Sequence, residues 1–435
     1  MCRSQSKINV AKPTERIDTN QFDQRNIKLL SFLAAEQLGY PGADGSDLWG
    51  WTDRKTGRDY ALMTFTDGTS FVDISNGKKP KYIGKLPSQT GSSYWRDIKT
   101  NRQYAYIVSD QNGRHGLQIF NLKRLRHAEK NTVFEANSIY KKIHSAHNIM
   151  IHNDYAYIVG ATKTDGLESK RIARGGLTIL NLKNPEKPKL AGKFKQDGYT
   201  HDTHVLTYIG PDKAHQGKTI AFNANADSFS IVDVSDKSKA KRISKNTYKN
   251  AGYIHQGWTN DNQRYYFLND SKDEKNLTGN NKSRTHIWDI KDLDNPNYLG
   301  FHNSTEFSTD HNLYIKDNIV YQANYTSGLR VLKIKRDHQS KAQIKLTEIA
   351  FLDTHPETHH PERHQGAWSS FPFFDNNKII ISDTERGLFI AKLKKGTAQP
   401  DQHGITSSQD SRFTREDGPH SWTDALSETA PLINH

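Results

Sequence analysis

The stretch that decides the fold is Ser145-Ala146-His147-Asn148-Ile149-Met150-Ile151, followed closely by Tyr155-Ala156-Tyr157-Ile158-Val159. Two short segments rich in β-branched and aromatic residues, separated by a polar turn, are typical of a β-hairpin. Comparable segments, each with a histidine at or near its start, recur at Thr203-His204-Val205-Leu206, Ile254-His255-Gln256-Gly257-Trp258, Asp310-His311-Asn312-Leu313-Tyr314 and His364-Gln365-Gly366-Ala367-Trp368. The chain is therefore predicted to consist of a repeated β unit.

A second apolar segment, often ending in an acid or amide, recurs seven times at intervals of 44 to 60 residues. Its copies are residues 70–74, 117–122, 177–182, 230–234, 285–290, 329–334 and 388–393. Each period divides into four short strands, which in the third unit are residues 147–152, 155–159, 177–182 and 187–194. Seven four-stranded units predict an all-β fold, a seven-bladed β-propeller. Four glycines just before third strands are expected to adopt positive φ: Gly116, Gly176, Gly328 and Gly387.

The two ends of the repeat array predict how the ring closes. The last unit supplies three strands and ends near Leu393, while residues 26–33 form an apolar strand with no earlier partner. We therefore expect the N-terminal strand to complete the last blade. Residues 1–24 are predicted to be a flexible leader, 25–395 the propeller, and 396–435 a disordered polar tail. An open β-solenoid is the alternative fold.

Charge and cysteine content restrict the partners and the cellular location. The net charge is +13, which favours acidic partners such as an anionic polysaccharide. The basic residues are scattered and no recognised nucleic-acid module is present, so we expect no nucleic-acid partner. The single cysteine, Cys2, excludes an internal disulfide, and no apolar run is long enough to span a bilayer. Cys2 directly after Met1 is compatible with a lipoprotein tethered to a membrane through a lipid on that cysteine.

Several motifs occur in the order found in a known family. They are Leu48-Trp49-Gly50-Trp51-Thr52-Asp53, Trp95-Arg96-Asp97-Ile98-Lys99, Asp197-Gly198-Tyr199-Thr200-His201-Asp202, residues 252–258 and residues 310–314. Over residues 25–395 the chain resembles the choice-of-anchor B family of LVIVD-repeat propellers. The resemblance implies a seven-bladed fold and a bacterial protein located outside the cell, at the cell surface or in the periplasm. It implies no particular reaction. The family's C-terminal apolar anchor is not evident here.

The propeller topology predicts one shared site. First strands line the channel and neighbouring strands run in opposite directions, so starts of first strands and ends of second strands share a face. Candidates for catalysis at this face are His147, His204, His255, His311, Arg96 and Asp97. Candidates for ligand binding are Trp49, Trp51, Trp95, Trp258, Trp368, Asp110, Asp270, Asp383 and Glu385, in which the indoles offer stacking surfaces.

Three interpretations of these residues remain open. They can be structural, lining the channel and bonding the next blade. They can bind a divalent metal such as Zn, Mn or Ca, with ligands drawn from His201, Asp202, His204, His255, His311 and His364. They can also serve metal-free acid–base chemistry, in which a histidine removes a proton next to a carboxylate.

The favoured function is a monomeric binding or interaction module that uses the His/Asp/Trp-lined face, with an acidic polysaccharide or a surface protein as partner. The alternative is a metal-assisted or histidine-based lyase or hydrolase acting on an acidic polysaccharide. The sequence contains no G-x-S-x-G, P-loop or H-E-x-x-H motif.

Overall fold

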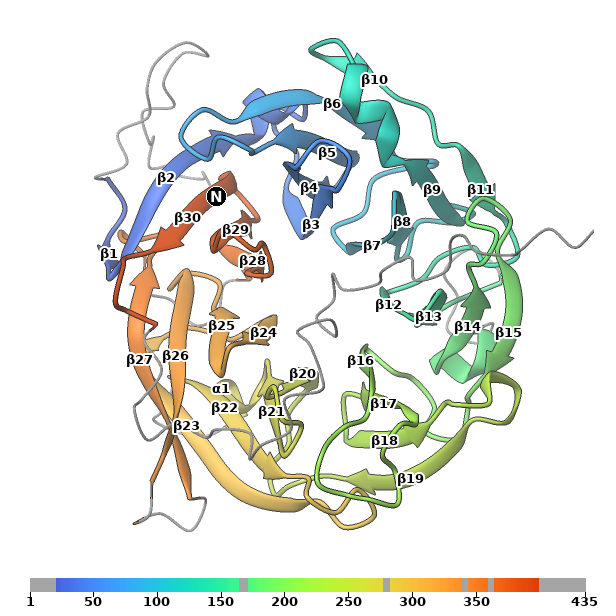
Figure 1. Cartoon of the computed structure of the whole chain (residues 1–435), viewed down its shortest axis with the longest axis vertical. Helices are drawn as coiled ribbons and strands as arrows, with labels where there is room; N and C mark the ends of the chain where they lie inside the picture. Colours follow the sequence, from blue (N-terminus) through green and yellow to red (C-terminus); the bar gives the residue numbers. More distant parts are fainter. Residues whose placement is uncertain are drawn as a thin grey trace, which may run out of the picture.

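Seven antiparallel sheets surround a central axis, as Figure 1 shows. The computed structural model describes residues 21–163, 171–276, 282–337, 339, 343–358 and 364–398. The predicted leader and tail fall mostly outside the described residues, as does Cys2. The all-β, seven-bladed propeller is confirmed. No helix in the described part of the chain is long and apolar enough to cross a membrane.

Each blade consists of four consecutive positions from the axis outward. Blade 1 contains β3 (Gly45–Asp53), β4 (Arg58–Phe65), β5 (Gly68–Asp73) and β6 (Lys81–Pro87). Blade 2 contains β7 (Arg96–Asn101), β8 (Tyr104–Ser109), β9 (Leu117–Asn121) and β11 (Ser138–Tyr140). Blade 3 contains β12 (Asn148–His152), β13 (Tyr155–Val159), β14 (Thr178–Asn181) and β15 (Lys189–Lys193). Blade 4 contains β16 (Asp202–Thr207), β17 (Thr219–Ala224), β18 (Phe229–Asp233) and β19 (Lys241–Asn246).

The remaining three blades follow the same order. Blade 5 contains β20 (Ile254–Thr259), β21 (Tyr265–Asp270), β22 (Lys282–Asp289) and β23 (Asn297–Phe307). Blade 6 contains β24 (Leu313–Lys316), β25 (Ile319–Ala323), β26 (Leu329–Arg336) and β27 (Ile344–Leu352). Blade 7 contains β28 (Ala367–Phe371), β29 (Lys378–Asp383), β30 (Gly387–Leu393) and, outermost, β2 (Ile27–Ala34).

Short elements connect or extend the blades. A two-residue strand, β1 (Gln24–Arg25), lies outside β27, and β10 (Thr132–Val133) pairs in parallel with β6. The helical turns are η2 (Ala35–Leu38), η3 (Leu122–His127), η5 (Ile172–Gly175), η6 (Lys237–Lys239) and α1 (Asp273–Asn276). Neither outer strand was predicted, because two residues carry too little pattern to be recognised.

The ring closes between the two ends of the described chain. β2 pairs antiparallel with β30, from Ile27 opposite Leu393 to Ala34 opposite Gly387. The prediction that the N-terminal strand completes the last blade is confirmed. Packing begins earlier than residue 25, since Phe22 is buried and its ring lies 4.9 Å from that of Phe389.

Glycine occupies the turn before several third strands for two different reasons. Gly116, Gly328 and Gly387 have φ of +74°, +73° and +113°, as predicted. Gly176 has φ of −75°, so the predicted positive φ is wrong there. Glycine is required at this position because no side chain fits, since a Cβ would lie 2.4 Å from the carbonyl oxygen of Phe194.

Packed side chains fill the channel below its mouth. The Trp49 ring lies 4.9 Å from that of Phe371, and the Trp258 ring lies 5.1 Å from that of Tyr314. The Lys99 ammonium lies 4.6 Å from the centre of the Trp49 ring. Burying aromatic surface of this size stabilises a fold by about 2–3 kcal/mol per side chain. The channel is therefore part of the core, and reachable chemistry is confined to its ends.

Candidate functional site

Four imidazoles and one indole form a row at the channel mouth, which we define as the end where the innermost strands begin. The row consists of His147, His201, His255, His311 and Trp368, one side chain from each of blades 3 to 7. Successive ring centres are 4.2, 4.2, 4.2 and 4.4 Å apart. The repeat thus brings side chains that are far apart in the sequence into contact.

Hydrogen bonds fix the orientation of the row at its open end. His147 Nδ1 lies 2.8 Å from Asp110 Oδ2, and His147 Nε2 lies 2.7 Å from His201 Nε2. His201 Nδ1 donates to the carbonyl oxygen of His255 at 2.9 Å. The side chains of His147 and Asp110 are 13% and 16% exposed, whereas His201 is buried. The Asp110–His147 pair is therefore the part of the row that a ligand can reach.

Each residue that follows a row position in the sequence is polar, and together with the equivalent residues of blades 1 and 2 these side chains form a second ring, one per blade. Its members are Asp47, Asp97, Asn148, Asp202, Gln256, Asn312 and Ser369. Several bond across blade boundaries: Asp97 accepts from the Ile149 amide at 2.8 Å, and Asn148 donates to Asp202 at 2.6 Å. Gln256 accepts from the Leu313 amide at 2.9 Å. This ring joins the blades rather than presenting groups to solvent.

Lys99 is the cation of this polar ring, and its ammonium contacts Asp97 and, at 3.2 Å, Asp47. Burial would raise the pKa of Asp47, but the charge of Lys99 and the hydrogen bonds that Asp47 makes with Asp97, Ser369 and the Leu48 amide together hold that pKa below its usual value. Burial keeps the pKa of Asp97 well above its usual value. Burial likewise raises the pKa of Asp202 to about 7. Near neutral pH, Asp47 is therefore the ionised partner of Lys99, whereas burial favours the protonated, uncharged form of Asp97.

Two predicted histidines do not belong to the row. β16 begins at Asp202, so His201 occupies the mouth of blade 4, and His204 points into the packed channel. The ring of His204 lies 3.7 Å from that of Trp258, and burial lowers its pKa to about 3. His364 is exposed and lies edge-on to Tyr325, while Trp368 takes the row position in blade 7. The sequence prediction misplaced both strand starts by a few residues.

Arg96 and Asp97 are also placed away from the mouth. The Arg96 guanidinium is buried between blades 1 and 2, where it donates to Ser88 Oγ at 2.9 Å and lies 3.3 Å from His115 Nε2. Asp97 belongs to the polar ring described above. Both side chains are buried, at 1% and 2% exposure, so neither is open to a ligand at the mouth.

Most of the predicted tryptophan platforms are buried. Trp49, Trp51 and Trp258 are 3%, 6% and 7% exposed and pack in the channel core, so the predicted stacking role is wrong for them. Trp368 is half-buried in the row. Trp95 is 37% exposed, and the neighbouring Tyr94 is 58% exposed. The Trp95 carbonyl accepts from the Asp110 amide at 2.8 Å, so this aromatic pair borders the mouth.

The predicted acids at strand ends have different roles. Asp270 is buried and accepts hydrogen bonds from the amides of Gly252 and Tyr253 at 2.7 and 2.5 Å. Asp383 is buried and accepts from the amides of Glu385 and Arg386. Both carboxylates shape loops, so their predicted ligand-binding role is wrong. The Glu385 side chain is exposed and accepts from Gln365 at 2.6 Å.

Sequence reasoning missed three residues beside His147. The Arg171 guanidinium lies 4.2 Å from the centre of the Tyr199 ring, and the Tyr253 ring lies 5.3 Å from that of His201. The charge of Arg171 also acts on Asp110, Tyr199 and Tyr253. A tyrosine two residues before the row histidine in blades 4 and 5 was the available signal. Arg171 follows a long loop and has no comparable signal.

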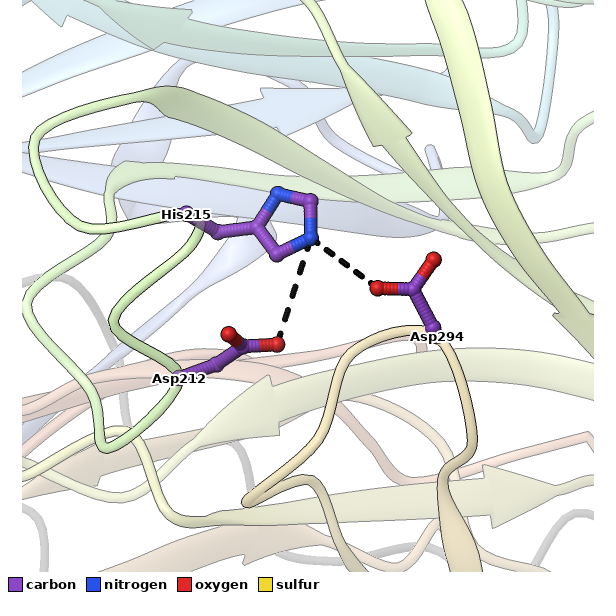
Figure 2. A group of neighbouring side chains, drawn as sticks. All are labelled: Asp212, His215 and Asp294. Carbon is purple, nitrogen blue, oxygen red and sulfur yellow. Dashed lines mark hydrogen bonds and ion pairs between the residues drawn. The ribbon is translucent and has the colours of Figure 1, made fainter.

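A group of possible metal ligands lies at the opposite end of the ring from the mouth. Asp212, His215 and Asp294 bring one ligand atom each within 4.8 Å of one another, and within the described ranges no other trio of His, Cys, Asp or Glu does so. Figure 2 shows His215 Nε2 between the two carboxylates, 3.2 Å from Asp294 and 3.9 Å from Asp212. None of these residues was predicted, and the row histidines do not converge in this way.

The same group is also complete without an ion. Lys218 Nζ lies 3.4 Å from His215 Nδ1, which suits a neutral imidazole that accepts from the lysine and donates from Nε2. Asp212 accepts from the Leu293 amide at 2.9 Å. A metal on Nε2 would place a proton on Nδ1, facing the ammonium group. The polar atoms of this group therefore have partners without an ion, and their contacts form a latch, a polar connection between blades 4 and 5.

No protein-family model matches the chain, and no curated protein matches its sequence. Among solved structures, the outer coat vertex of COPII on membranes has a TM-score of 0.52 at 12% identity, covering 84% of this chain and 88% of that one. The β-propeller domain of Cps50 (Swd1) from Myceliophteria thermophila gives 0.46 at 10%, covering 79% and 96%. The periplasmic gluconolactonase of Pseudomonas aeruginosa gives 0.45 at 11%, covering 68% and 83%. The likeness to the COPII chain shows the fold alone.

Proposed function

We propose that the protein is a binding module whose channel mouth holds an acidic polysaccharide. The observation that carries this proposal is the combination of exposed aromatic rings with a cation and an imidazole at one mouth. The backbone of Trp95, next to Tyr94, bonds the Asp110 amide, His147 contacts the Asp110 carboxylate, and the charge of Arg171 acts on that carboxylate. The rest of the channel is packed, so a ligand can enter no deeper.

The chemistry of these side chains suits a sugar that carries a carboxylate. An indole or phenol ring stacks on the apolar face of a sugar ring. Arg171 presents a planar guanidinium that pairs with a carboxylate through two hydrogen bonds. Asp110 can accept from a sugar hydroxyl. The net charge of +13 would steer a polyanion to the surface.

Direct binding measurements test the proposal. Polygalacturonate should bind by isothermal titration calorimetry, and an uncharged glucan of similar length should not. Trp95→Ala and Arg171→Ala should each weaken binding about tenfold, the loss expected for one stacking or charge-assisted contact. Phe307→Ala and Arg58→Ala are controls, since both side chains are exposed, Phe307 on the outer strand of blade 5 and Arg58 at the start of β4, the end of blade 1 opposite the mouth. Equal losses in the controls would overturn the proposal.

A second candidate function is a metal-free lyase on the same polysaccharide, favoured by Arg171, which can pair with the uronate carboxylate, and by His147, which can donate a proton to the departing oxygen. A base would remove the proton next to the uronate carboxylate, the bond to the leaving oxygen would break, and a carbon–carbon double bond would form. The departing oxygen would take up a proton. Absorbance of the unsaturated product distinguishes this activity from binding. We place no step at a metal.

We propose further that the protein is exported and belongs with the choice-of-anchor B propellers. The motifs of blades 1 to 6 support the family, and Cys2 supports a lipid tether. Expression of the full-length gene in a bacterial host tests export and the lipid tether. A protein that is labelled by palmitate, and loses the label in a Cys2→Ser variant, would support the tether. An unlabelled protein recovered in the cytoplasm would contradict it.

A further inference from the structure

We infer that His201 is a positioning residue that holds His147 as an imidazolium, so that the mouth receives anions through a protonated histidine as well as Arg171. This inference rests on the proposed function for its ligand, but its evidence is the hydrogen-bond series alone. Three contacts of 2.7 to 2.9 Å connect Asp110, His147, His201 and the His255 carbonyl. Each contact needs one proton between its two heavy atoms.

The three contacts allow the extra proton on Asp110, His147 or His201, and the burial of His201 together with an ionised Asp110 selects His147. A carbonyl oxygen only accepts, so His201 Nδ1 must carry the proton it donates to His255. A neutral His201 then has a lone pair on Nε2, and His147 Nε2 must donate to it. An ionised Asp110 likewise only accepts, so His147 Nδ1 must also donate. His147 therefore carries two protons and forms a charge-assisted pair with Asp110.

The surroundings agree with this location of the charge. Burial would raise the pKa of Asp110, yet the hydrogen bond and charge of His147, the Gln111 amide and the charge of Arg171 together hold that pKa below its usual value. Burial keeps the pKa of His201 and His255 well below the ordinary range and lowers that of His311 to about 3. The groups that act on His147 are Asp110, Tyr199, His201, Asp202, His255 and His311. His147, whose side chain is 13% exposed, holds the proton because solvent and Asp110 both stabilise its charge.

The assignment has a consequence for chemistry at the mouth. A doubly protonated His147 can donate a proton or attract a carboxylate, but it cannot remove a proton until it has lost one. Once it loses the Nε2 proton, two lone pairs face each other across 2.7 Å, and the two rings must separate. Anion binding should therefore weaken at high pH.

Nitrogen-15 NMR of the ring nitrogens in the full-length protein at pH 7 tests the assignment without any ligand. His147→Gln identifies the signals, and we expect both nitrogens of His147 to show a bonded proton. His201→Gln places an acceptor oxygen near the position of Nε2 and should keep both protons. His201→Leu has similar size but no acceptor, and should leave His147 with one proton and bind polygalacturonate about tenfold less tightly.

The outcomes separate this inference from the proposed function. A singly protonated His147 in the wild-type protein at pH 7 would overturn it, whatever the ligand, and this measurement decides the matter even if His201→Leu does not fold. A pH profile of binding that is the same in wild type and His201→Leu would also overturn it. Doubly protonated His147 without polygalacturonate binding would refute the proposed function and leave the role of His201 standing.

Discussion

His147 and His201 meet through their Nε2 atoms at 2.7 Å, although 54 residues and a blade boundary separate them. The contact exists because the repeat places the start of each inner strand at the same level of the ring. His147 is the imidazole of the row that a ligand can reach, and Asp110 bonds its other ring nitrogen. The chemistry of the mouth therefore depends on the spacing between blades 3 and 4.

Replacing Lys99 by methionine should destabilise the fold strongly. The variant would leave the buried, ionised carboxylate of Asp47 without its cation and would remove the contact of Lys99 with Asp97, and breaking a buried ion pair in this way costs about 3–5 kcal/mol. Urea unfolding measures the loss. Lys193→Met, at an exposed position of β15, should change stability by less than about 0.5 kcal/mol. Similar midpoints for the two variants would contradict the buried network.

Asp202 should make stability depend on pH between about 4 and 7. Its pKa is raised to about 7 in the folded chain from the usual 3.8. In this window the folded state therefore binds more protons than the unfolded state, and stability falls as pH rises. Asp202→Asn keeps an acceptor for Asn148 and removes the titration. Urea unfolding at pH 5 and pH 7.5 should show a smaller difference for the variant, and an unchanged difference would be evidence against the raised pKa.

Gly387→Ala should weaken the closure of the ring. The residue has φ of +113°, and a Cβ would lie 2.4 Å from the Leu33 carbonyl oxygen of the N-terminal strand. We expect a loss of about 1–3 kcal/mol from backbone strain and displacement of β2. Gly57→Ala is the control, with positive φ but nothing within 4 Å of the added carbon. The thermal midpoint should fall further for Gly387→Ala, and equal shifts would speak against the tight contact.

Removal of divalent ions should leave the thermal midpoint unchanged. His215 contacts Asp294 directly and Lys218 lies at its other nitrogen, so the latch between blades 4 and 5 is satisfied without an ion. His215→Ala should lose about 1 kcal/mol, the net contribution of one such hydrogen bond. A midpoint that falls with a chelator and recovers with Zn²⁺, in the wild type but not in His215→Ala, would instead establish a metal site.

The fold was predictable because each blade repeats the same local pattern of short apolar strands. Seven third strands, the proline and glycine punctuation, and one unmatched strand at residues 26–33 sufficed to predict the blade count and the closure. For the site, the sequence predicted that histidines gather at the end where the inner strands begin, but it did not predict which histidine of each blade lies there. In His201-Asp202-Thr203-His204, either histidine fits a strand start, and a shift of three residues separates a mouth position from a core position. That choice depends on where pairing with β17 begins, which local sequence does not encode.

The aromatic residues illustrate the same limit. Trp49, Trp51 and Trp258 were expected near the rim, yet they lie well inside the inner strands β3 and β20 and are buried instead of facing a ligand. Inner strands pack against one another across the axis, and seven of them leave an opening that large side chains close. Arg171 could not be found at all, since its place beside Tyr199 depends on how a long loop returns to the sheet.

The pairing of β2 with β30 has a consequence for biogenesis. The outer strand of blade 7 leaves the ribosome first, and its partner, Gly387–Leu393, is among the last described residues to be made. Blades 1 to 6 can form their own pairs during synthesis, but the circle stays open until translation is nearly finished. Contacts this distant along the chain form slowly. A nascent chain stalled before residue 387 would keep the edge of its first segment unpaired, and would be a natural target for chaperones.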